Sequence, residues 1–77
     1  MIYKIVGIER FVSKAGKNIT KIHSIYQGEK IAGVGCETFF ILTENVPDTI
    51  AVDLKFTPYY GRQGANGFLA GINIVNE

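Results

Sequence analysis

Cysteine and histidine are nearly absent from this chain of 77 residues, which contains one of each, Cys36 and His23. A single cysteine excludes an internal disulfide, and one cysteine with one histidine cannot supply the four ligands of a structural zinc site. A chain of this length buries only about two-thirds of the surface that its unfolded form exposes, so its stability needs other support. We therefore expect a compact barrel or an oligomer.

Long hydrophobic runs are also missing. No apolar run approaches the roughly 20 residues that a membrane-spanning helix requires, and residues 1–4 enter a strand-like pattern without the regions of a signal peptide. With 47% hydrophobic and 19% charged residues, the composition is that of a globular protein. We expect a soluble protein with no membrane partner, in a reducing, cytoplasmic compartment.

Motifs for catalysis and cofactor binding are scarce too. The chain has neither a Gly-x-Gly-x-x-Gly fingerprint nor a phosphate-binding loop that ends in Gly-Lys-Ser/Thr. His23 and Cys36 are its only thiol–imidazole pair, and ordinary strand positions account for both without a catalytic dyad. Carboxylates that flank strands, such as Asp48 and Asp53, fit turn and solvent-facing roles. We expect a protein that is not an enzyme and that holds no metal or cofactor.

β-Branched residues dominate the composition. Isoleucine, valine and threonine together number 22, whereas alanine, leucine and methionine number 9. β-Branched side chains favour strands because their restricted χ1 costs little on a pleated surface, and no apolar set recurs at helical spacing. We therefore interpret residues 1–77 as one all-β domain. The five strands are expected at 2–12, 19–27, 36–43, 49–57 and 68–75.

Local patterns refine these strands. Gly7 lies within the first strand, where a glycine suits a bulge or a bend at a barrel corner. Phe39 and Phe40 are neighbours in the third strand, so regular alternation sends one inward and the other outward. From Ile50 onward every second residue of 49–57 is apolar, which predicts one strand over that whole segment.

Five antiparallel strands with a bent first strand indicate a small closed or partly open barrel. We expect the oligonucleotide/oligosaccharide-binding barrel (OB-fold), with an SH3-like barrel as the alternative. The last strand, 68–75, carries apolar residues on both faces, which is more than one small core requires. A two-fold dimer would cover this excess, and a strand that packs on both sides near a barrel corner would also explain it.

Charge is unevenly distributed although the formal net charge is only +1. Residues 1–27 have a net charge of +4 and residues 28–53 a net charge of −4, and no acid occurs between Arg10 and Gln27. Segregation of this kind can give a nearly neutral protein a basic face.

Cations and aromatic rings together define a candidate site. Rings that stack on bases, with cations that follow the backbone, are the means by which proteins bind single-stranded nucleic acid, and a basic hairpin can close over phosphates. The competing explanation is that these aromatics fill the barrel or an oligomer interface and that the cations cover a solvated hairpin end. The candidate nucleic-acid-binding residues are Lys14, Lys17 and Lys21 on the first hairpin, Tyr26 at the end of the second strand, and Tyr59, Tyr60 and Arg62 before the last strand.

The order of these features resembles that of the small single-stranded DNA-binding proteins of the filamentous-phage gene V type. The resemblance covers nearly the whole chain as a pattern, and it rests on 13–17 in the first hairpin, 37–42, 49–57, and 64–69 leading into 72–75. It implies a five-stranded OB-type barrel, a two-fold dimer, and cooperative, largely sequence-independent coating of single strands during replication.

The resemblance also implies roles for single positions. The family's phosphate-contacting hairpin residues fall on Lys14 and Lys17, and its stacking aromatic at the end of the second strand falls on Tyr26. The chain departs from the family pattern, which has aromatic residues or arginines there, at Ile19, Asn66, Gly71 and Asn73.

The sequence therefore predicts a dimeric OB-fold that binds single-stranded DNA without sequence preference and serves the replication of a phage or mobile element. The alternative is a protein-interaction barrel that uses the same aromatics on a peptide or a partner subunit, which the modest net charge favours. An enzyme is a distant third hypothesis, because the inventory of catalytic groups is so small.

Overall fold

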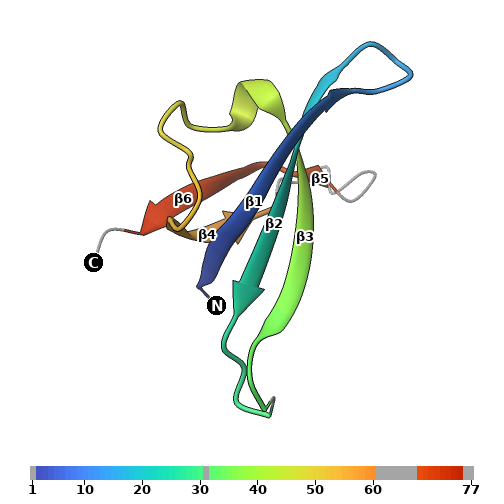
Figure 1. The fold of residues 1–77 in the computed structure, drawn as a ribbon. Helices are drawn as coiled ribbons and strands as arrows, with labels where there is room; N and C mark the ends of the chain where they lie inside the picture. The colour runs from blue at the N-terminus through green and yellow to red at the C-terminus, as the bar shows by residue number, and fades with distance from the viewer. Residues whose placement is uncertain (1, 31, 61–67, 76–77) are drawn as a thin grey trace.

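The computed structural model describes residues 2–30, 32–60 and 68–75, in which every regular element is a β-strand except one turn of 3₁₀ helix (Figure 1). The all-β prediction is confirmed. None of the described residues belongs to a helix long and apolar enough to cross a membrane. The elements are β1 (Tyr3–Val12), β2 (Asn18–Tyr26), β3 (Gly35–Leu42), the 3₁₀ helix η1 (Thr43–Asn45), β4 (Lys55–Tyr59), β5 (Phe68–Leu69) and β6 (Gly71–Val75).

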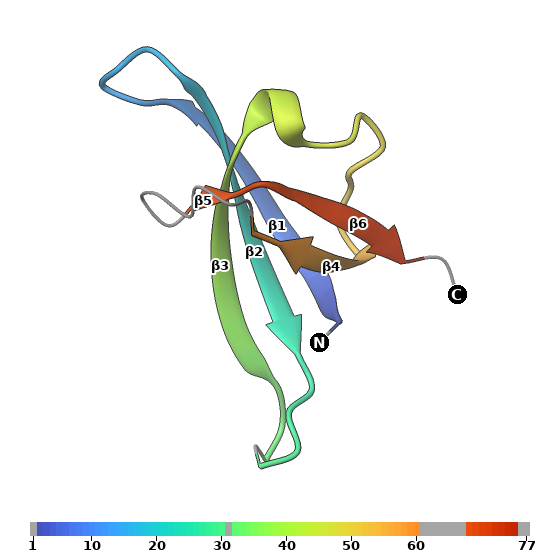
Figure 2. The ribbon, with the colours of Figure 1, turned by 180° about the vertical axis from the view of Figure 1, so that it is seen from behind.

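Two groups of strands differ in length and direction. β1, β2 and β3 run side by side as a long antiparallel meander, and the hairpin between β1 and β2 projects beyond the other elements (Figure 1). Seen from behind, the shorter strands β4 and β6 cross the long strands steeply (Figure 2). The core lies between these two groups, so each long strand has one face turned to the core and one turned away from it.

The strands form one sheet in the order β5-β3-β2-β1-β4-β6. The sheet differs from the five antiparallel strands expected for a closed or partly open barrel: the described residues form six strands in a mixed sheet, with β3 and β5 parallel, and no ladder of hydrogen bonds joins its two end strands. The reason lies at Ala70, where the chain bends. Before Ala70 the chain pairs with β3, and after it the chain pairs with β4. One segment of chain thus connects the two ends of the sheet.

Gly7 marks a bend in β1, as predicted. The pairing between β1 and β2 shifts register between Ile5 and Gly7, which is the signature of a β-bulge. On the N-terminal side of the bulge, Tyr3 and Lys4 pair with β4 and also lie beside β2. The bend therefore lets β1 serve both groups of strands.

The predicted strand over 49–57 is wrong before Lys55, where β4 begins. Asp53 has a φ of 76°, in the left-handed region that interrupts the regular alternation of a strand. Its backbone N–H donates to the carbonyl of Ile5 at 2.8 Å, so the turn is fastened to β1. As a consequence, Val52 is 51% exposed instead of joining the core.

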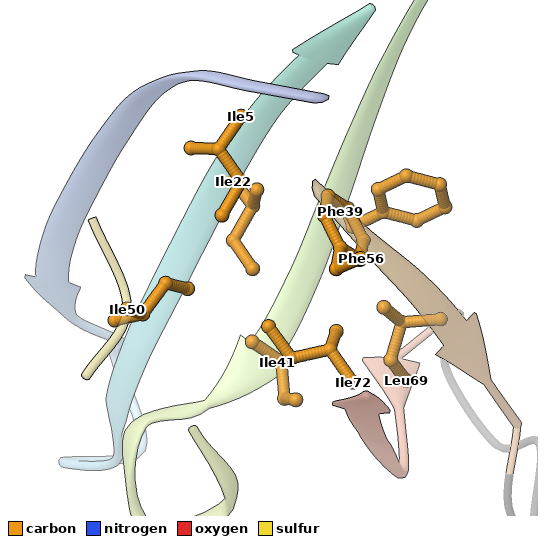
Figure 3. Close-up of a cluster of buried hydrophobic side chains, with 8 residues drawn as sticks. All are labelled: Ile5, Ile22, Phe39, Ile41, Ile50, Phe56, Leu69 and Ile72. Atoms are coloured by element: carbon orange, nitrogen blue, oxygen red, sulfur yellow. The ribbon is translucent and has the colours of Figure 1, made fainter. Parts of the chain in front are cut away.

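The core is built around two phenylalanine rings (Figure 3). The rings of Phe39 and Phe56 meet edge to face with their centroids 5.8 Å apart, and Tyr3 packs against both. Full burial of one large apolar side chain contributes about 1.5–3 kcal/mol. The buried cluster consists of Ile5, Ile22, Phe39, Ile41, Ile50, Phe56, Leu69 and Ile72.

The predicted last strand, 68–75, is divided at Ala70 into β5 and β6. Leu69 and Ile72, on either side of this bend, are only 3% and 5% exposed and belong to the core of their own chain. The excess of apolar surface that suggested a dimer is therefore partly accounted for within one chain.

Replacing Phe56 by alanine should lower the free energy of unfolding by about 3–5 kcal/mol, because the ring is fully buried between aromatic neighbours. Urea unfolding followed by circular dichroism measures the loss. The control is Val52→Ala at an exposed position, which should change the free energy of unfolding by less than about 0.5 kcal/mol. Equal unfolding midpoints for the two variants would contradict this core.

Candidate nucleic-acid interface

The long strands present an outer face, turned away from the core. On β2, Ile22 and Ser24 are buried, whereas Lys21, His23 and Ile25 are half-buried on the other side of the strand. Antiparallel partners share a face, so the pairing with β1 and β3 arranges the outer face in rows. These rows are Phe11, Ile19 and Leu42; Glu9, Lys21 and Phe40; Gly7, His23 and Thr38; and Lys4, Ile25 and Cys36.

Three phenylalanines lie side by side on the outer face, and we call Phe11, Phe40 and Phe68 the phenylalanine row. The Phe40 ring meets Phe11 and Phe68 edge to face, each with centroids 6.4 Å apart. Phe11 and Phe40 are each 37% exposed. The Nζ atom of Lys21 lies 5.5 Å from the centroid of the Phe40 ring, which is a cation–π contact. The row is therefore an exposed aromatic surface with a cation held against it.

The turn between β1 and β2 is shaped by its own hydrogen bonds. The backbone N–H of Ser13 donates to the carbonyl of Lys17 at 2.8 Å, the N–H of Lys17 donates to Oγ of Ser13 at 3.1 Å, and Gly16 has a φ of 81°. Lys14 and Lys17 are exposed on this projecting turn (Figure 1). In the part of the chain that the structure describes, no carboxylate lies within ion-pair distance of either lysine. Both cations are therefore open to an anionic partner.

Glu9 adds a carboxylate to the outer face. The sequence has no acid between Arg10 and Gln27, yet the pairing of β1 with β2 brings Glu9 directly opposite Lys21. Its Oε1 atom lies 3.4 Å from Nε2 of His23. Since both side chains are partly exposed to solvent, this pair contributes little to stability. The positive charge of the site is therefore concentrated toward the hairpin turn.

Tyr26 ends β2, at the opposite end of that strand from the hairpin lysines. Its ring covers Gly35 of β3, where a Cβ atom would overlap the ring, and it meets the ring of Tyr3 edge to face at 5.4 Å. Partial burial raises the pKa of Tyr3, with further contributions from the carboxylate of Glu37 and the phenols of Tyr26 and Tyr60. Tyr26 therefore belongs to a cluster of tyrosines at the strand ends.

The remaining predicted residues lie on or beyond β4. Tyr59 places its ring over Gly71 of β6, where a Cβ atom would overlap the phenol, and it is 46% exposed. Tyr60 is 65% exposed, and its phenol lies close enough to Tyr3 to influence that group. Arg62 lies outside the described residues.

The predicted site residues do not form one cluster. Lys14 and Lys17 lie on the hairpin turn, and Lys21 follows on the outer face of β2. Tyr26 lies five residues beyond Lys21, which is about 17 Å along a strand, and it joins Tyr60 through Tyr3. The structure thus places Lys21 beside an exposed aromatic ring, groups Tyr26 and Tyr60 around Tyr3, and leaves Tyr59 over Gly71.

Sequence reasoning missed the phenylalanine row. Its one usable signal was the Phe39–Phe40 pair, and the alternation predicted there is confirmed, with Phe39 6% and Phe40 37% exposed. That pattern could not show that Phe11 and Phe68 would flank Phe40, because the three rings come from different strands and meet only through strand pairing.

The two groups considered for catalysis are not direct cross-strand partners. His23 faces Thr38 across β2 and β3, whereas Cys36 faces Ile25, and the described hydrogen-bond partner of His23 is Glu9. Residues 2–30, 32–60 and 68–75 contain no group of three or more histidine, cysteine or acidic side chains that could hold a metal ion.

Comparison with known proteins adds no relative. The chain matches no family model, no curated protein and no solved structure. The resemblance to the gene V type therefore remains a prediction.

Replacing Gly35 by alanine should displace the Tyr26 ring and lower the free energy of unfolding by about 1–3 kcal/mol, because the added methyl overlaps that ring. Gly7→Ala is the matched control, since its Cβ would lie at an ordinary 3.5 Å from the His23 side chain. Urea unfolding of the two variants is the measurement. A Gly35→Ala variant as stable as Gly7→Ala would show that the ring does not cover Gly35.

Proposed function

We propose that this protein binds single-stranded DNA without sequence preference, in the replication of a phage or mobile element. The observation that carries the proposal is the cation–π contact of Lys21 with the exposed ring of Phe40, on a face that leads to Lys14 and Lys17. Stacking on aromatic rings is sequence-tolerant because every base has a π-face. An unpaired strand, whose bases are free to leave their own stack, is the ligand that fits this surface.

The hairpin lysines supply the electrostatic part of the proposed binding. Phosphates neutralised by lysines release condensed counterions, so affinity from this source falls as salt concentration rises. Lys14 and Lys17 suit this role because they are exposed on a turn that projects from the sheet (Figure 1). They contact the backbone alone, so they add affinity without reading sequence.

Phe40 supplies the stacking part. Its edge-to-face contacts with Phe11 and Phe68 restrain the ring before any ligand arrives, so little conformational freedom is lost on binding. Lys21, already beside the ring, can move its ammonium group to the phosphate of the stacked nucleotide. One residue pair thus contacts both the base and the backbone.

We also infer an OB-type arrangement and a two-fold dimer. Counted as one bent strand, β5 and β6 contact both β3 and β4, which supports a partly open Greek-key barrel. Ile2, Val6 and Val12 are between 45% and 64% exposed and offer apolar surface to a second copy. Analytical ultracentrifugation of the protein alone tests the dimer.

A protein-interaction barrel is the second candidate. The net charge of +1 and the carboxylate of Glu9 beside Lys21 favour it, and exposed aromatics such as Phe11 and Phe40 are typical of protein-binding surfaces. A mainly apolar interface binds with little dependence on salt, whereas phosphate binding weakens as salt increases.

Fluorescence anisotropy of a labelled oligo-dT of about 30 nucleotides should show binding that weakens with salt and exceeds that of a duplex control. Lys14→Ala/Lys17→Ala should flatten the slope of log Kobs against log salt by about 1.4, since each phosphate contact to a single strand contributes roughly 0.7. Lys30→Ala, at another exposed lysine, is the control and should leave the slope unchanged.

Two results would contradict this proposal. Absence of oligo-dT binding at low salt would exclude single-stranded DNA as the ligand and leave the protein-interaction barrel. Binding with an unchanged salt slope in Lys14→Ala/Lys17→Ala would remove the hairpin from the site.

Replacing Phe40 by alanine should weaken oligo-dT binding at least fivefold, because stacking contributes about 1–3 kcal/mol per base. Phe40→Trp keeps an aromatic face and should retain most of the affinity, which separates stacking from simple loss of bulk. The measurement is the same anisotropy titration, with circular dichroism to establish folding. Equal affinity of the alanine and tryptophan variants would show that no base stacks at this position.

A further inference from the structure

A pocket lies at the ends of β1 and β2, on the side opposite the hairpin turn. Its volume is ≈ 340 Å³, near the lower end of the range for small-ligand sites and suited to a single ring system. The lining is mainly apolar but includes two cations. Its lining includes Ile2, Ile25, Tyr26, Val34, Lys4 and Lys55.

The two lysines of the pocket are cross-strand neighbours. Lys4 on β1 pairs with Lys55 on β4, so two cations lie next to each other across the strands. Lys4 also approaches Asp53, with Nζ and Oδ1 3.8 Å apart, but the two side chains are 47% and 78% exposed, so this ion pair is weak. An anionic group bound between the two side chains would contact both cations and could displace Asp53 from Lys4.

The pocket opens at the end of the same face that carries the proposed DNA surface. Lys4 and Ile25 line the pocket and belong to the last row of the outer face. Lys21 lies four residues before Ile25 on β2, opposite Phe40 of β3. Four residues of a strand span about 13 Å. His23, which packs over Gly7, lies between them on the same face. A DNA strand with one base stacked on Phe40 therefore reaches the pocket if it continues along β2.

We infer that this pocket takes one unpaired base of the bound strand and that Lys4 and Lys55 hold the adjoining phosphate. The inference rests on the proposed function and deepens it. Apolar walls suit the faces of a base, and paired cations suit a phosphate, so one nucleotide matches both parts of the lining. A duplex does not match, because its bases are not free to enter.

Val34→Glu tests the pocket, since it places a carboxylate in the lining at a loop position that is 52% exposed and therefore tolerant of change. Val52→Glu is the matched control, with the same substitution at a position 51% exposed and outside the pocket. In the oligo-dT titration with the full chain, Val34→Glu should bind about tenfold more weakly than Val52→Glu. Circular dichroism and urea unfolding show that both variants fold.

A second pair of variants tests the cations. Lys4→Gln removes a phosphate contact and should lower the slope of log Kobs against log salt by about 0.7. Asp53→Asn removes the acid beside Lys4, and asparagine tolerates the left-handed backbone there, so this variant should bind about twofold more tightly. If the ion pair had only a structural role, Lys4→Gln and Asp53→Asn would change the oligo-dT affinity in the same direction.

The outcomes separate the two proposals. If oligo-dT binds and Val34→Glu matches Val52→Glu, or Lys4→Gln keeps the wild-type slope, the nucleotide pocket is wrong while single-stranded DNA binding stands. If a peptide or a second copy occupies the pocket, the oligo-dT affinity of Val34→Glu likewise stays at the control value. Failure of the wild-type protein to bind oligo-dT overturns the proposed function and this inference together.

Discussion

The burial of one face of the β1–β2–β3 meander is the constraint on which the rest of this structure depends. With a single cysteine no internal disulfide can assist, so the apolar core has to hold the chain together. Ile22 packs opposite Phe39 on the inner face. Because side chains alternate along a strand, the same register places Lys21 opposite Phe40 on the outer face. Core packing and the proposed binding surface are thus two sides of one pairing, and a shift of register would destroy both.

The bend at Ala70 connects the core with the outer face in a second way. It lets Leu69 and Ile72 enter the core from strands that pair with different partners. It also holds β5 against β3, which brings Phe68 beside Phe40. An aromatic surface is therefore assembled by a segment whose main energetic role is to complete the core. The same short segment therefore contributes to the core and to the outer face, as expected in a small domain with few residues to spare.

Charge follows a different logic from packing. The exposed lysines of the hairpin turn carry no ion pair among the residues described, and long-range attraction to phosphates needs no exact geometry. On the sheet itself, strand pairing determines which charges are neighbours, since it places Glu9 opposite Lys21 and Lys4 opposite Lys55. In the proposed function, the hairpin is therefore the region of first contact and the outer face is the region that positions a nucleotide.

Composition and alternation by themselves determined the all-β class, the three long strands to within a residue or two, the basic turn and the bulge at Gly7, because these depend on local chain chemistry. The single strand that alternation predicted over 49–57 is interrupted before Lys55, where Asp53 turns into the left-handed region and is held there by a hydrogen bond to β1. The phenylalanine row, the position of Glu9 and the pocket at the strand ends were decided by the tertiary structure alone. Each joins residues from different strands, and the register that brings them together is set by burial of the opposite face, which no local pattern contains.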